Sequence, residues 1–175
     1  MPPRPKISEI MVVNAALKVA RRDGHQRINA RSVAKELNCS TQPIMYHFQT
    51  IDDLKSAALE RIARFHRDYI LDIAEGQNPL IAVSLNYIRF AAEEKNLFRF
   101  LFDAEGGGRS LPLMIQSGDI RPLTQGLPFG TDVSDEVLFY TAVLAHGWAS
   151  VIARGDCEFD EDKIARSLEN ALRQN

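Results

Sequence analysis

The stretch NARSVAKELNCSTQPIMYHFQTIDDL, residues 29–54, decides the fold of this chain of 175 residues. It predicts a short helix over residues 29–37, a tight turn at residues 38–39, and a second short helix that starts at residue 40 or 41 and ends at residue 47. The small Ala34 stands where the two helices must cross closely, and the asparagine in the turn tolerates a left-handed backbone. The pattern is that of a helix-turn-helix.

The second short helix has two chemically different sides. Because an α-helix has about 3.6 residues per turn, Ile44 and Phe48 share the side that faces the core. The opposite side, which is free to enter a major groove of DNA, consists of Thr41, Gln42, Met45 and Tyr46. The Gln42 amide suits bidentate recognition of adenine, and Thr41 or Met45 can meet a thymine methyl group.

Polar residues around this side are candidates for contacts with DNA phosphates. The complete set of candidate DNA-binding residues is Arg31, Thr41, Gln42, Pro43, Met45, Tyr46, His47, Thr50 and Lys55. Two of them have an ordinary alternative. His47 is also typical of a half-buried packing residue, and Arg31 of a solvated surface charge.

The charge of the chain is divided unevenly between its two ends. Residues 1–55 carry nine Lys or Arg against five Asp or Glu, a formal charge of +4. Residues 56–175 carry 12 basic and 18 acidic side chains, a formal charge of −6. Such a division favours a basic head on a polyanion and an acidic body that stays off it.

The remaining sequence predicts helices and no persuasive strand. We expect an all-α protein of about nine helices, with a DNA-binding domain over residues 1–50 and a helical body over residues 51–175. Further helices are expected over residues 7–23, 51–75, 79–95, 96–104, 134–154 and 160–173. Pro and Gly interrupt residues 109–132, which leaves at most a short helix at 113–117 and a turn near 121–125.

Residues 7–55 resemble the TetR family of transcriptional regulators. The resemblance rests on Arg22-Asp23-Gly24 after the first helix, Val33-Ala34 in the second, residues 40–48, and Asp52-Asp53-Leu54-Lys55. A weaker resemblance covers residues 145–149, AHGWA. The family often has Tyr where Met45 stands and Lys near Ile51, so two of its usual phosphate contacts are missing here.

The resemblance also implies an effector cavity in the body and a homodimer formed by the last two helices. The aromatic residues that can line such a cavity, or form ordinary core, are Phe65, Tyr69, Tyr87, Phe90, Phe98, Phe102 and Trp148. The expected dimer contacts are Phe139, Val143, Val151, Ile164, Leu168 and Leu172. The expected partners are therefore double-stranded operator DNA, a second copy of the chain and a small-molecule effector, and the family's commoner output is repression.

Other classes of function find little support. The chain has no HExxH, no GxSxG and no Cys/His pair at metal-ligand spacing, so we expect no enzyme, metal site or cofactor. Two distant cysteines and the absence of a secretory signal favour a cytoplasmic protein. Residues 137–153 are apolar, but they are few for a membrane span, and burial between subunits explains them better. The remaining alternative is a helical protein-interaction adaptor with a degenerate DNA-binding head.

Overall fold

The computed structural model describes residues 7–102 and 133–173, and every regular element within these ranges is a helix. These ranges hold eight α-helices and one 3-10 helix, against about nine helices expected for the whole chain. They are α1 (Glu9–Asp23), η1 (His25–Arg27), α2 (Ala30–Glu36), α3 (Gln42–His47), α4 (Ile51–Ile70), α5 (Pro79–Glu93), α6 (Lys95–Phe102), α9 (Asp135–Arg154) and α10 (Glu161–Arg173). The prediction of an all-α protein is confirmed.

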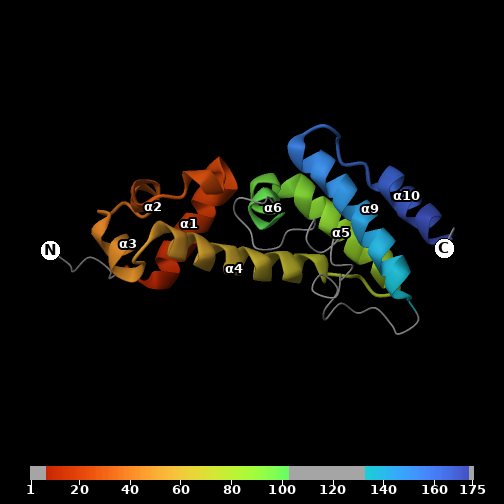
Figure 1. Ribbon diagram of the computed structural model, residues 1–175, viewed down its shortest axis with the longest axis horizontal. Coiled ribbons are helices and arrows are strands. Elements are labelled where there is room, and N and C mark those ends of the chain that lie inside the picture. The colour runs from red at the N-terminus through yellow and green to blue at the C-terminus, as the bar shows by residue number, and fades with distance from the viewer. Residues whose placement is uncertain (1–6, 103–132, 174–175) are drawn as a thin grey trace.

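The molecule is elongated, with a small head at one end and a larger body at the other (Figure 1). The head consists of α1, η1, α2 and α3, and the body of α5, α6, α9 and α10. The long helix α4 runs from one to the other, and one continuous apolar core joins Leu54 and Ile62 of α4 to Phe90 of the body. The division into domains at residue 50 therefore stays a prediction, because apolar packing crosses that point.

Helix starts are set by local side chains. Asn29 accepts hydrogen bonds from the backbone N–H groups of Arg31 and Ser32 and forms a capping box with Ser32. Thr50 and Asp53 form the same arrangement at the start of α4. Such caps satisfy N–H groups that have no partner inside the helix. Asn78, Ser134 and Asp160 accept backbone N–H hydrogen bonds in the same way at the starts of α5, α9 and α10.

Helix α4 ends at Ile70 and not near Glu75 as the apolar spacing predicted. The buried side chain of Asn86 in α5 donates to the carbonyl oxygens of Ile70, at 3.4 Å, and Asp72, at 2.9 Å. These contacts satisfy backbone acceptors at the helix end and let the chain turn back toward α5. Two other predictions lie outside the described residues: the end at Ala104 of the helix expected over 96–104, and the elements expected within 109–132.

Helix α9 packs along α5, and α10 packs against both. By length and composition alone, α9 is also the one helix among the described residues that could span a membrane. Only 28% of the most apolar 18-residue stretch of α9 is buried inside the chain. Much of an apolar helix in the body thus remains accessible to a partner.

Candidate nucleic-acid interface and aromatic cluster

The turn between α2 and α3 has the geometry that the sequence predicts. Asn38 has a φ of 50°, and it is the only described non-glycine residue with a positive φ. Ala34 is 4% exposed, and its carbonyl oxygen accepts from the Cys39 N–H at 3.0 Å. The buried Val33, Ile44 and Phe48 lie beneath the turn. The helix-turn-helix is therefore built on its own small apolar core.

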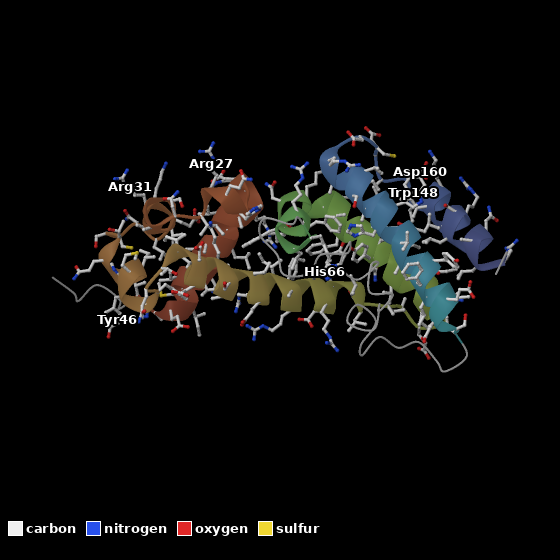
Figure 2. The ribbon with its side chains drawn as sticks, viewed as in Figure 1. Arg27, Arg31, Tyr46, His66, Trp148 and Asp160 are labelled. Carbon is white, nitrogen blue, oxygen red and sulfur yellow. The ribbon has the colours of Figure 1, made fainter. Side chains whose placement is uncertain are left out.

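The outer side of α3 is exposed along its length. Thr41, Gln42, Met45 and Tyr46 are all exposed, with Tyr46 at 80% (Figure 2), whereas Ile44 is fully buried. Pro43 is half-buried in the first turn of the helix, where its fixed backbone angle favours a helix start. The four exposed side chains form the face of the head that is open to a groove.

Three predicted phosphate contacts already have partners within the protein. His47 Nε2 lies 2.9 Å from the carbonyl oxygen of Ile7, so the half-buried ring joins the end of α3 to the residues before α1. The Thr50 hydroxyl donates to Asp53 at 2.7 Å, and the half-buried Lys55 lies 3.7 Å from Asp52. This geometry favours the packing interpretation of His47 and makes Thr50 a capping residue first. Tyr46 and Arg31 stay exposed.

Six of the seven predicted pocket aromatics form one cluster between α4, α5 and α6. Ring centroids lie 5.7 Å apart for Phe65 and Phe90, 5.5 Å for Tyr87 and Phe102, and 4.8 Å for Phe98 and Phe102. Tyr69 joins the cluster at its edge, 5.3 Å from Phe90. Aromatic pairs at these separations attract one another beyond simple burial.

Trp148, the seventh predicted pocket residue, lies outside this cluster. Its indole Nε1 donates to Ser167 in α10 at 3.4 Å, and the Lys163 ammonium lies 5.7 Å from its ring centroid. Figure 2 shows Trp148 beside α10, away from His66. The side chain leaves α9 on the side opposite to the cluster, a direction that composition alone does not reveal.

Two histidines that the sequence analysis did not single out complete the cluster. His66 lies 4.8 Å from Phe90 between ring centroids, and His146 lies 5.8 Å from Phe98. His66 falls on the buried row Ile62, His66, Ile70 at intervals of four, a spacing that could have revealed it. His146 belongs to the AHGWA segment but has no such local signal.

A neutral hydrogen bond lies inside this aromatic cluster. The Tyr87 hydroxyl is 2.7 Å from His146 Nδ1. Burial lowers the pKa of His146 to about 4 and raises the pKa of Tyr87, so both groups stay uncharged and the phenol donates to the imidazole. At the edge, Tyr69 donates to Glu93 at 2.6 Å, and burial followed by this bond raises the pKa of Tyr69. The cluster is thus mainly apolar, with the uncharged Tyr87–His146 pair and the buried His66 ring as its polar members.

The expected dimer contacts divide into two groups. Ile164 and Leu168 are fully buried in the core of the protomer itself, which removes them from any interface. Their four-residue spacing marks the inner face of α10. The residues that remain partly exposed are Phe139, Val143, Val151 and Leu172. Tyr140, which is 49% exposed and lies edge-on to Phe139 with 5.8 Å between ring centroids, adds to this surface.

The head also contacts the body directly, through α1 and α6. Arg21 pairs with Glu94 at 2.9 Å, and its guanidinium carbon lies 5.4 Å from the ring centroid of Phe65. The Asn96 amide donates to the carbonyl oxygen of Arg21 at 2.9 Å. His25 stacks on Phe100 with 4.9 Å between ring centroids. The last turn of α1 is therefore attached to the aromatic end of the body.

Comparisons with known proteins agree with this architecture. No family model matches the chain. No curated protein matches it either. The crystal structure of the multidrug binding protein EbrR complexed with imidazole is 18% identical, with a TM-score of 0.61 over 98% of this chain and 97% of that one. A TetR-family transcriptional regulator from Haemophilus influenzae RD, HI0893, is 15% identical, with a TM-score of 0.59 over 94% and 93%. The chain thus has a TetR-like fold.

Proposed function

We propose that this protein is a cytoplasmic transcriptional repressor that binds a pseudo-palindromic operator as a homodimer and is released by a small apolar effector. The observation that carries the proposal is the helix-turn-helix with its outer α3 face exposed, at the far end of the molecule from the body. The TetR-like fold shared with EbrR and HI0893 supports it.

Each protomer would place α3 in a major groove. A dimer then reads two half-sites about one helical turn apart, roughly 34 to 36 Å or somewhat more. Gln42 is our proposed base reader, with Thr41 and Met45 against thymine methyl groups. Tyr46 and Arg31 would contact phosphates, with Lys55 as a weaker contributor because Asp52 lies beside it.

The dimer would form through the accessible faces of α9 and α10. Phe139, Val143, Val151 and Leu172 each keep part of their apolar surface open in the single chain. Apolar surface that is contiguous on long helices is stabilised when a second copy covers it. An apolar effector would bind near the aromatic cluster and lower DNA affinity by favouring the conformation in which the two heads are farther apart.

The decisive experiment is a gel shift at several salt concentrations with DNA from upstream of the protein's own gene. We expect salt-sensitive binding by the wild type and a loss of sequence preference in Gln42→Ala. Lys55→Ala should weaken all sequences alike. If the wild type binds no duplex, a protein-interaction adaptor becomes the better hypothesis for the function. If Gln42→Ala keeps its full sequence preference, another residue recognises the bases.

The effector part of the proposal needs its own measurement. Thermal unfolding with a panel of small apolar aromatic compounds should reveal at least one that raises the melting temperature and weakens DNA binding. Phe98→Ala should lower the affinity for that compound. If no compound in the panel raises the melting temperature, the aromatic cluster is ordinary hydrophobic core and not an effector site.

A further inference from the structure

The basic residues of the head fall into two groups according to their partners. Four of the cations in residues 7–55 form ion pairs: Lys18 with Glu36, Arg21 with Glu94, Arg22 with Asp23 and Glu36, and Lys55 with Asp52. Their charge is locally compensated. The other three, Arg27, Arg31 and Lys35, have no carboxylate within 4.0 Å among the described residues.

The unpaired cations form a row, here called the α2 row and defined as Arg27, Arg31 and Lys35. They recur at intervals of four residues along η1 and α2, and all three are exposed. Arg31 and Lys35, four residues apart within α2, lie on one face of that helix, about 6 Å from one another along its axis. Arg27 lies in η1, and the extended residues Ile28 and Asn29 separate it from α2. Figure 2 shows Arg27 and Arg31 extending outward from the same side of the head.

One carboxylate, Asp23, is near enough to respond to the row. Hydrogen bonds from Arg22, at 2.9 to 3.1 Å, are the main reason that the pKa of Asp23 is lowered, and Arg27 and Lys35 contribute less. Asp23 is thus occupied by Arg22. Arg27 and Lys35 lie close to the same acid without pairing with it, so both remain available to an external anion.

The backbone beneath the row is held firmly. The Arg27 carbonyl oxygen accepts from the Ser32 hydroxyl at 2.7 Å and from the Asn29 amide at 3.1 Å. The Arg31 N–H donates to Asn29 at 3.0 Å. These bonds fix the first turn of α2 relative to η1, so the positions from which the cations project lose little freedom when an anion binds.

We propose that Arg27 and Lys35 join Arg31 in binding phosphates of one DNA strand beside the groove that α3 enters. The inference rests on the proposed function and extends it to two residues outside the helix-turn-helix reading face. Exposed cations without partners add little to folding stability, whereas each phosphate that they neutralise releases counterions. A spaced row on a rigid support suits a linear polyanion.

The test is the salt dependence of binding to the operator and to an unrelated duplex. Arg27→Gln/Lys35→Gln should lower the slope of log K against log salt by about 2 in magnitude, because each phosphate contact contributes about 0.9. Affinity should fall by the same factor for both duplexes, since phosphates carry no sequence information. Glutamine keeps most of the side-chain length and leaves the fold intact.

The matched control is Arg61→Gln/Arg64→Gln, which removes two exposed cations from the middle of α4 with the same change in net charge. Its slope should equal that of the wild type. If the wild type binds its operator but the α2 row variant has the same salt slope as this control, the inference fails and the proposed function stands. An acidic protein partner would then be the better candidate to bind the α2 row. If the wild type binds no duplex, both fail.

Discussion

At the scale of single residues, the buried His146, which accepts from Tyr87, makes the stability of the body depend on pH. The imidazole is neutral because burial lowers its pKa to about 4, below the ordinary value of 6.5. As the pH falls through this interval, the unfolded chain takes up a proton that the folded protein excludes. The free energy of unfolding must therefore decrease from pH 6.5 toward pH 4.

We expect His146→Gln to weaken this pH dependence. The wild type should lose at most about 3 kcal/mol between pH 6.5 and 4 through this residue, and about 2 once partial solvent access to the ring is included. Glutamine still offers an acceptor for Tyr87 but does not titrate. Urea unfolding of both proteins at pH 7 and pH 4.5 gives the difference. Equal losses in the two proteins would mean that His146 is not the responsible group.

Residue roles were predictable from sequence where the cause is local. Asn38 and Ala34 follow from what a tight turn and a close helix crossing require, and the structure has both. His47 has a neighbour that sequence spacing did not reveal, Ile7, whose carbonyl oxygen lies 2.9 Å from the His47 ring nitrogen. The direction of Trp148 likewise depends on where α10 lies. Long-range neighbours decide such cases.

At the scale of elements, α6 connects the aromatic cluster with the head. Phe98 and Phe102, four residues apart, face the cluster, whereas Asn96 and Phe100, also four apart, face α1 and η1. A side chain that moves in the cluster therefore acts on a helix that also holds the end of α1. The head has a second attachment to the body besides the continuous backbone of α4.

Asn96→Ala should loosen this attachment without disturbing the rest of the body. Loss of the amide leaves the carbonyl oxygens of Arg21 and Arg22 without that donor, at a cost of about 1 kcal/mol. Amide hydrogen exchange should accelerate in residues 24–28 and stay unchanged in α9 and α10. Uniform acceleration over the whole chain would show a global loss of stability, and no change would show that the bond does not hold the head.

Helix starts were easier to predict than helix ends. Asn29, Thr50 and Ser134 act on backbone groups within three residues, so the caps are legible in the sequence. The end of α4 depends on Asn86, whose partners lie 14 and 16 residues earlier in the chain. An apolar spacing that continues beyond Ile70 gave no sign of this, and the helix was predicted too long.

At the scale of the whole molecule, the accessible side of α9 should determine the oligomeric state. Tyr140→Glu places a charge on an apolar surface, and burying that charge in a dimer is costly. We expect the dimer dissociation constant to rise at least tenfold, about 1.4 kcal/mol, in sedimentation velocity. Tyr46→Glu, on the exposed side of α3, is the matched control and should leave the mass unchanged. A monomeric wild type would contradict the proposed dimer.

The anchoring of α4 by Asn86 has a mechanical consequence. A helix of 20 residues is about 30 Å long, and Asn86 holds the carbonyl oxygens at its body end. If α4 tilts by about 5° about that end, its other end moves about 2.6 Å sideways, and the contacts between α1 and α6 must shift with it. A small rearrangement around Asn86 would therefore displace Ile51, at the end of α4 next to the head, farther than it displaces the body end of α4.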